Sequence, residues 1–385
     1  MQLYKVYQLC FLLAAIIVLP ACNENEAISP LDLTDALEVD IDSLEDIYTS
    51  ESVGLIMEKS MQWQLLNPVP KNDGNGMLWA RSAFYIGIMA VAESLQKEKY
   101  FRVAQNWSDS RRWKMGNRYD HADDHSAGQL FAELYLHQPN RAHIEGLTQT
   151  FDQLMTEGRV GRELYWWADA LFMSPPVLAR LYAITGDEAY LNFLGETWWD
   201  SYEFLYDQED DLFFQSHWFF NYKTPNGNKT FWARANGWVM AGTVRVLQHL
   251  PADNQYYSRF VSLHQAMAER IVKLQQEDGL WRPSLLDSAQ APYPETSSTG
   301  FFTYALAWGV NNGYLDRETY EPHIKAAWQG MVGAIHPNGM LGWVQPGGSE
   351  PDEVTYDNFQ EFGTGAFLLA GSEIYKMGLR GSATK

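Results

Sequence analysis

The feature that most constrains the fold of this chain is a series of helical patterns with very little strand pattern between them. The connecting stretches carry Gly, Pro, Asn and Asp, which interrupt helices. Such a series predicts an all-α protein. The predicted helices span 43–66, 77–97, 99–115, 126–137, 141–157, 169–185, 187–205, 231–250, 256–276, 298–313, 318–334 and 359–377.

Many of these segments are apolar on more than one face, as at 301–310. A helix of that kind is expected in an inner layer covered by an outer one. Twelve helices arranged as six hairpins therefore predict an (α/α)6 barrel, with an inner ring inside an outer ring. An α-solenoid would need a fixed repeat period, which the sequence does not show.

Three long stretches lack helical patterns, namely 206–230, 278–297 and 335–358. We expect them at one rim of the barrel, where they would form the cleft. A strand-like piece at 212–215 is predicted to form a small hairpin on this rim. Binding residues are therefore sought there first.

The N-terminus has the pattern of an export signal. Lys5 precedes an apolar run at 9–19, which is too short for a comfortable membrane span. The sequence LPAC then follows and resembles a bacterial lipobox, in which Cys22 is lipidated and becomes the new N-terminus. Because Pro20 is unusual at its position, cleavage without a lipid is the alternative.

Three regions follow from this pattern. We expect a lipoprotein-type signal peptide over 1–22, an acidic tether over 23–46 and an (α/α)6-barrel catalytic domain over 47–385. The protein would be exported and anchored by its lipid in the bacterial cell envelope, facing the periplasm or the outside. Cys10 and Cys22 are the two cysteines of the chain, so the mature protein would have no free thiol and no disulfide.

Charge and aromatic content narrow the expected partners. The formal net charge is −20 and the pI about 4.8, so nucleic acid is not expected to bind, since it requires basic patches. Aromatic residues make up 14% of the chain. Their flat rings suit a cleft that binds sugars. An acidic sugar would need local Arg or Lys side chains, because the overall field repels it.

Asp169 is the candidate general acid. It follows two indoles, Trp166 and Trp167, and precedes a run of helix formers. Aromatic walls would disfavour the charged carboxylate and raise its pKa toward neutrality, where it can donate a proton. The alternative is that Asp169 caps a helix by accepting from backbone amides.

A second acidic candidate is the pair Asp123 and Asp124, which stands directly before a predicted helix. These carboxylates could be caps, or one could point into the cleft and order water or a sugar hydroxyl. His121 and His125 flank the pair, but no two of these residues lie four apart on a predicted helix with a third ligand. We therefore expect no metal and no other cofactor.

Several basic side chains could bind an acidic sugar. Arg159 and Arg162 lie beside glycines upstream of Asp169, and their planar forks match a carboxylate. His217 stands beside an indole in the rim segment that also contains Lys223. Each of these residues could instead be ordinary surface or structural side chains.

Arg234 and Trp238 form the strongest binding candidate. They are four residues apart and so lie on one face of a predicted helix, with Gly237 between them. A guanidinium beside an indole suits an acidic sugar by charge pairing and stacking. The alternative is an arginine buried against a tryptophan in the barrel wall.

These motifs resemble the unsaturated rhamnogalacturonyl hydrolases of glycoside hydrolase family 105, which are related to the unsaturated glucuronyl hydrolases. The resemblance spans most of the chain after the tether. It rests on WADALFM at 167–173, WARANGW at 232–238, ETSST at 295–299 with YALA at 304–307, DHSAGQ at 124–129 and GWVQP at 342–346.

The resemblance implies an (α/α)6 barrel that removes a 4,5-unsaturated uronic acid from the non-reducing end of lyase-generated oligosaccharides, with a rhamnogalacturonan-type substrate expected. Asp169 would protonate C4, water would add at C5, and the resulting hemiketal would open and release the sugar. One acid suffices for this chemistry, whereas a conventional glycosidase needs two carboxylates at the anomeric carbon.

The resemblance also assigns roles to single residues. Asp124 would hold water or substrate, with Asp123 as the close alternative. His217, Arg234 and Trp238 would bind the unsaturated sugar. The remaining binding candidates are Arg159, Arg162 and Trp343. Family members often carry a His-Lys pair where this chain has Gly158 and Arg159, which bears on the exact substrate.

Three alternatives remain open at the level of sequence. The enzyme could act on another polyuronide as an unsaturated glucuronyl hydrolase. A sugar epimerase of the barrel type would need histidines as acid and base, with His217 and His121 as candidates. A glycan-binding lipoprotein without activity would keep the aromatics but would not need Asp169.

Overall fold

A computed structural model describes residues 35–70 and 78–379. The predicted signal peptide, Cys22 and the first part of the tether lie outside the described residues. Within the described ranges, no helix combines the length and apolar character needed to cross a bilayer. The remaining tether residues pack on the barrel, because Lys59 donates to the carbonyls of Leu37 and Val39, and Gln62 accepts from the amide of Ala36.

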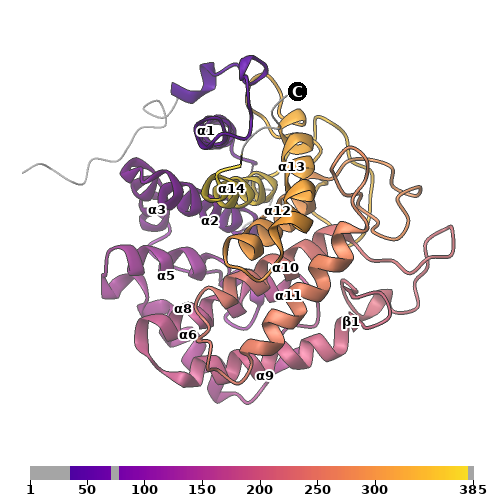
Figure 1. Ribbon diagram of the computed structural model, residues 1–385. Helices are drawn as coiled ribbons and strands as arrows, with labels where there is room; N and C mark the ends of the chain where they lie inside the picture. Colours follow the sequence, from indigo (N-terminus) through magenta and orange to yellow (C-terminus); the bar gives the residue numbers. More distant parts are fainter. Residues whose placement is uncertain (1–34, 71–77, 380–385) are drawn as a thin grey trace, which may run out of the picture.

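Twelve long helices form two concentric rings among the described residues, which confirms the predicted (α/α)6 barrel (Figure 1). Each helix of the inner ring contacts the next, and the last contacts the first. The inner ring comprises α2 (Leu78–Leu95), α5 (Ala127–His137), α8 (Pro175–Thr185), α10 (Ala233–Leu247), α12 (Thr296–Asn311) and α14 (Glu361–Met377). The outer ring comprises α1 (Ser50–Leu66), α3 (Glu98–Ser110), α6 (Glu145–Thr156), α9 (Glu188–Leu205), α11 (Tyr257–Val272) and α13 (Arg317–Gly333).

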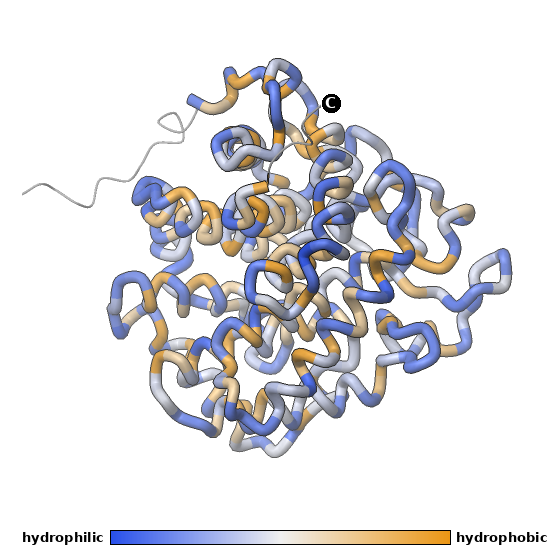
Figure 2. The backbone as a smooth tube through the Cα atoms, in the orientation of Figure 1, coloured by the Kyte–Doolittle hydropathy of each residue, from blue (hydrophilic) through white to orange (hydrophobic). Residues whose placement is uncertain are grey.

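The inner helices are apolar on most faces because they are buried on most faces. Every residue of α10 is buried, and Figure 2 shows hydrophobic segments gathered toward the centre of the molecule. Glycines allow the inner helices to approach closely. A Cβ added to Gly87 would lie 2.7 Å from the carbonyl oxygen of Gly365 on α14, so a larger residue there would push two helices apart.

Two predicted helices differ from the observed ones at points that local chemistry explains. The first helix begins at Ser50 rather than at 43, since the side chain of Thr49 caps it by accepting from the amide of Ser52. The segment predicted as one helix over 169–185 is interrupted at Ser174, between the short helix α7 (Ala170–Met173) and α8. Two prolines follow Ser174, and a residue before proline is disfavoured in helical conformation.

The three long non-helical stretches lead directly into the N-terminal ends of α10, α12 and α14, as predicted for a rim. The first contains a two-stranded antiparallel hairpin of β1 (Tyr206–Asp207) and β2 (Leu212–Phe213). Isolated bridges connect the stretches to neighbouring segments, for example Trp167 to Ser216 and Trp232 to Ser284. The rim is therefore a connected platform.

A buried ion-pair network lies deeper in the barrel. Glu133 of α5 accepts from Arg180 of α8 at 2.6 Å and from Arg245 of α10. Arg180 also donates to two backbone carbonyls, and Arg245 donates to Gln129. Burial alone raises the pKa of Glu133, but the two arginines outweigh it and hold the pKa below its usual value.

Candidate active site

A cavity of about 190 Å³ lies at the N-terminal ends of the inner helices. Its walls combine indoles with a few polar groups, which is the usual composition of a small-ligand site. The wall residues come from α2, α10, the short helix that carries Asp123, the Asp169 segment and the rim stretches. They are Trp79, Asp123, Trp167, Asp169, Met173, Gln215, Trp232, Arg234, Trp238 and Gly348.

Asp169 lies in this cavity and is not a helix cap. It precedes α7, yet its side chain makes no capping hydrogen bond, and its backbone is already helical. Asp169 is 9% exposed, and Gln215 donates an amide hydrogen to its carboxylate at 3.3 Å. Burial raises the pKa of Asp169 to about 6, while Arg234, its own amide and Gln215 pull the pKa downward.

The structure corrects the choice between the two neighbouring carboxylates. Asp124 is 4% exposed and accepts three hydrogen bonds from Arg118, at 2.6, 2.7 and 3.2 Å. Although burial acts in the opposite direction, these bonds lower the pKa of Asp124. Asp123, on the same short helix α4 (Ala122–His125), lines the cavity instead. Asp124 therefore holds the local fold together, and Asp123 is the carboxylate available to a ligand.

Asp123 and Asp169 act on each other. Burial, followed by the charge of Asp169, raises the pKa of Asp123 to about 7. A carboxyl group beside a second one in a poorly solvated cavity ionises less readily, so the pKa values of both lie near neutrality, at about 6 and about 7. The cavity thus offers one acidic proton together with one carboxylate that can order water.

Arg234 and Trp238 both line the cavity, but in different ways. Trp238 is 1% exposed and packs on Phe301 with ring centroids 4.1 Å apart, so it forms part of the floor. Arg234 donates to the carbonyl oxygens of Gln345 and Pro346 at 2.6 and 2.7 Å. Its guanidinium therefore holds the third rim stretch in place beside Asp169. Whether it also clamps a uronate stays a prediction.

The other predicted arginines lie outside the cavity and have local partners. Arg159 pairs with Asp120 and Glu157 at 3.1 and 2.7 Å. Arg162 forms a two-pronged ion pair with Asp200 of α9. Neither guanidinium is a free receptor for a carboxylate, which corrects their expected availability. Both are exposed enough for surface pairs of this kind to contribute little stability.

His217 and Trp343 also lie outside the cavity wall. Trp343 is half-buried in the third rim stretch with a left-handed backbone, φ 56°, and its carbonyl accepts from the amide of Thr296. His217 is exposed, and its ring lies 6.5 Å from that of Trp166. Its neighbour Trp218 is 64% exposed.

An aromatic shelf, composed of Trp166 and Trp218, leads away from the cavity. The two ring centroids are 5.3 Å apart, and Trp166 lies 4.8 Å from Trp167 in the cavity wall. An exposed indole loses apolar hydration when a flat ligand covers it. The shelf is therefore suited to stacking on sugar rings that extend beyond the cavity.

Sequence reasoning did not identify Trp79, Gln215 and Trp232 as site residues. Gln215 ends the strand-like piece at 212–215 and is buried although it is polar. A glutamine at the end of an apolar rim strand was the available signal. The sequence carried no such signal for Trp79, because this residue lies in the first turn of α2, far in sequence from the other site residues.

One acidic cluster in the described part of the chain has spacing suited to a metal ion, namely Asp207, Glu209 and Asp210. Lys229 lies among them, with its amine 2.8, 2.8 and 2.9 Å from the three carboxylates. The ammonium group already balances this charge, so the cluster acts as an ion-pair anchor for the rim.

The chain matches the family model described as Glycosyl Hydrolase Family 88 over residues 47–378. An unsaturated 3S-rhamnoglycuronyl hydrolase of Formosa agariphila is 36% identical over 344 residues, covering 83% of this chain and 90% of the relative. A protein of the same name from an Alteromonas species is 31% identical over 371 residues, covering 87% and 89%.

Two solved structures are similar over nearly their whole length. A glycosyl hydrolase family 88 protein from Bacteroides vulgatus gives a TM-score of 0.79 at 30% identity, covering 85% of this chain and 99% of that one. A structure named as a polysaccharide lyase gives a TM-score of 0.79 at 32% identity, covering 85% and 98%.

Proposed function

Because the chain belongs to glycosyl hydrolase family 88 and is therefore a glycoside hydrolase, we propose that it releases a 4,5-unsaturated uronic acid from the non-reducing end of lyase-generated oligosaccharides. Family membership favours this reaction over an epimerase or a glycan-binding lipoprotein. The cavity supports removal of one terminal sugar, since its volume of about 190 Å³ is below the roughly 300–1,000 Å³ of sites that enclose larger ligands.

The observation that carries the proposal is the pair of carboxyl groups, Asp169 and Asp123, in one indole-walled cavity with raised pKa values. Asp169 donates its proton to C4 of the unsaturated sugar, which leaves cationic character at C5. Water adds at C5 and gives its proton to the carboxylate pair, with Asp123 holding that water. The hemiketal then opens, and the glycosidic bond breaks without attack at the anomeric carbon.

The proposed substrate is an unsaturated uronyl sugar linked to a 3-sulfated rhamnose, because both relatives are named unsaturated 3S-rhamnoglycuronyl hydrolases. The aromatic shelf of Trp166 and Trp218 would stack on the sugar after the scissile bond. The rhamnogalacturonan-type substrate expected from the sequence forms the second arm of the test.

The test follows the absorbance of the conjugated double bond in lyase-generated disaccharides. The panel contains sulfated rhamnoglucuronyl, unsulfated rhamnoglucuronyl and rhamnogalacturonyl compounds. We expect the native enzyme to remove the absorbance, fastest for the sulfated compound. Intact ulvan is included because a polysaccharide lyase would raise its absorbance. Unchanged absorbance across the panel, or a rise with intact polymer, would overturn the proposal.

We also propose that the protein is lipid-anchored through Cys22 in the bacterial cell envelope, on the basis of the LPAC sequence and the apolar run before it. Cells grown with labelled palmitate should yield a labelled protein in the membrane fraction. Cys22→Ser should abolish the label and release the protein. A native protein that is exported without the label would contradict this anchor and support simple cleavage.

A further inference from the structure

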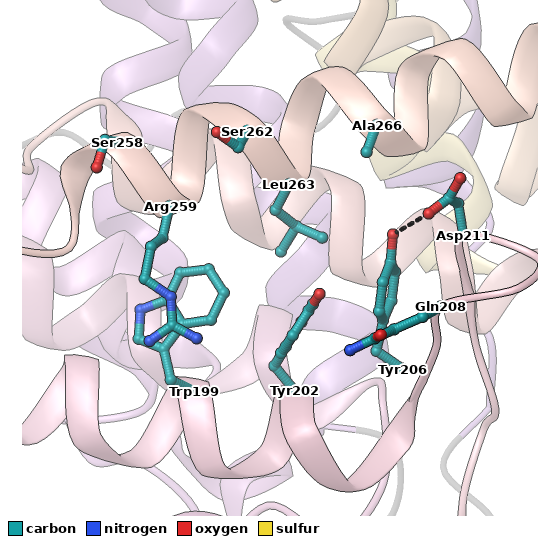
Figure 3. A pocket seen from close by; sticks show the side chains of 10 residues that line it. All are labelled: Trp199, Tyr202, Tyr206, Gln208, Asp211, Ser258, Arg259, Ser262, Leu263 and Ala266. Carbon is teal, nitrogen blue, oxygen red and sulfur yellow. Dashed lines mark hydrogen bonds between the residues drawn. The ribbon is translucent and has the colours of Figure 1, made fainter.

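A second groove lies on the outer face of the barrel, between α9 and α11 (Figure 3). Its volume is about 400 Å³, and none of its wall residues belongs to the catalytic cavity. Three aromatic residues form one wall, namely Trp199 and Tyr202 of α9 and Tyr206, which directly follows the helix and begins β1. Figure 3 shows these rings projecting toward α11.

The aromatic wall presents stacked rings to the groove. The rings of Tyr202 and Tyr206 are 4.6 Å apart and inclined by 25°, and that of Trp199 meets Tyr202 edge-on at 5.2 Å. Both tyrosines remain partly exposed. Helix packing would normally cover such rings with apolar side chains from the facing helix.

The facing wall instead consists mostly of small and polar side chains. Ser258, Ser262 and Ala266 follow one another at four-residue spacing along α11, so they form one stripe opposite the rings. Leu263 fills the base of the groove. Small side chains on this stripe keep the two helices apart at the surface and leave room for a flat ligand.

Several polar groups around the groove have no protein partner among the described residues. No side-chain hydrogen bond to another described residue forms at Tyr202, Gln208 or Ser262, whereas Tyr206 donates to Asp211 at 2.8 Å. The indole nitrogen of Trp199 is buried and lacks a hydrogen-bond acceptor in the same part of the chain. Donors and acceptors beside apolar rings match a sugar, which carries hydroxyl groups around flat C–H faces.

A cation is placed at one end of the groove. The guanidinium of Arg259 lies 3.9 Å above the ring centre of Trp199, and its side chain is 46% exposed. Arg259 forms a loose, exposed ion pair with Glu203 at 4.0 Å, which is too long for a hydrogen bond. In a chain of net charge −20, a guanidinium held open on an indole favours an acidic group on the ligand.

From these observations we propose that the groove between α9 and α11 is a second saccharide-binding site, which binds a segment of an acidic polysaccharide. Tyr202 and Tyr206 stack on its sugar rings, and Arg259 pairs with its carboxylate or sulfate group. The site would hold the polymer or its long fragments near the catalytic cavity. This inference rests on the proposed function only in choosing a saccharide as the ligand.

The test separates binding from turnover. Binding is measured by native electrophoresis in gels containing ulvan, or neutral hydroxyethylcellulose as a control, with Asp169→Asn present in every variant so that the enzyme cannot turn over. Turnover of the unsaturated disaccharide is measured in the same groove variants with Asp169 intact. The groove variants are Tyr202→Ala, Tyr202→Phe and Arg259→Gln. Arg102→Gln, an exposed arginine of the outer helix α3, is the charge-matched control.

We expect ulvan to retard the parent and the Arg102→Gln control equally. Tyr202→Ala and Arg259→Gln should weaken retardation at least tenfold, Tyr202→Phe should retain most of it, and disaccharide turnover should stay within twofold of native. Equal retardation of the parent and Arg259→Gln, or no retardation of the parent, would overturn the proposal. A failed absorbance test with retained groove-dependent retardation would reject the proposed reaction and leave this site standing.

Discussion

The barrel buries carboxyl groups at two levels and treats them in opposite ways. Deep in the barrel, Glu133 is clamped by Arg180 and Arg245, and its pKa is lowered. At the rim, Asp169 lacks such a clamp, because the terminal nitrogens of nearby Arg234 donate to backbone carbonyls, and its pKa is raised to about 6. Arg234 at the rim and Arg245 in the deep network both belong to α10, where they lie about 16 Å apart along the helix axis.

The difference shows that burial alone does not set the protonation state of a carboxyl group in this barrel. Desolvation acts to raise the pKa at both levels. The two arginines outweigh it at Glu133, whereas at Asp169 it prevails and raises the pKa to about 6. The deep network therefore supports the fold, whereas the rim pair reduces stability at neutral pH in exchange for chemistry.

The largest expected effect is on turnover in Asp169→Asn, which keeps the shape of the side chain but has no proton to donate. We expect kcat for the unsaturated disaccharide to fall by about 10²- to 10⁴-fold, the range of a lost general acid. The fall in kcat is measured by absorbance assays on the folded variant. A variant within threefold of native activity would remove Asp169 from the reaction.

The same variant should be more stable than the native protein at neutral pH. The folded pKa of about 6 lies above the ordinary value of 3.8 for an aspartate, so the stability associated with this group is complete below pH 3.8 and is lost as pH rises through about 6. Asparagine avoids this loss. The free energy of unfolding of Asp169→Asn should exceed that of the native protein by about 2–3 kcal/mol above pH 6, and this difference should shrink toward pH 4. Thermal unfolding at several pH values measures it.

The opposite outcome is expected for Glu133→Gln in the deep network. Removing this charge leaves Arg180 and Arg245 buried without their carboxylate, which should lower the free energy of unfolding by about 3–5 kcal/mol. At temperatures where the variant is folded, kcat should be unchanged. Denaturant unfolding and turnover together measure the two effects, and a loss of kcat without a loss of stability would break the contrast.

The two neighbouring aspartates provide a matched pair within the rim. Asp123→Asn should reduce kcat by at least about tenfold and, like Asp169→Asn, should raise stability at neutral pH, because Asp123 lines the cavity and its pKa is raised. Asp124→Asn should leave kcat nearly intact and reduce stability by about 1–3 kcal/mol, since it weakens the bonds to Arg118. If the two phenotypes are exchanged, the assignment of roles within α4 is wrong.

The smallest effect should come from Gln215→Leu. Gln215 donates to the carboxylate of Asp169 and so favours its charged form. Without this bond, the pKa of Asp169 should rise, and the fall of activity at alkaline pH should move upward by up to about one pH unit. A pH profile of kcat measures the shift. A downward shift would mean that Gln215 supports the protonated form.

Most of the fold could be predicted from the chain, because helix-forming segments and rim stretches alternate regularly. The break at Ser174 was also readable from the prolines that follow it. The start of α1 at Ser50 was not, since acidic residues before it are compatible with a helix until Thr49 caps it.

The site was predicted in part, and the errors have one cause. Asp169 could be singled out because its indole neighbours are adjacent in sequence. The partners of Arg162 and Arg234 come from distant segments, and their pairing depends on tertiary structure, whereas Asp124 pairs with Arg118, six residues earlier, through the local turn. Asp200 on α9 pairs with Arg162, and the carbonyls of Gln345 and Pro346 accept from Arg234. Residue type and spacing show which side chains could bind a ligand but not which ones already have a partner.

The most direct test is a carboxyl ¹³C NMR titration of protein labelled at aspartate, compared with Asp169→Asn and Asp123→Asn. We predict two linked signals with midpoints near pH 6 to 7, both affected by either substitution, and a lower midpoint for Asp123 once the charge of Asp169 is removed. If every aspartate instead titrates below about pH 4.5, the cavity holds no proton at neutral pH and the account of Asp169 as the acid is wrong.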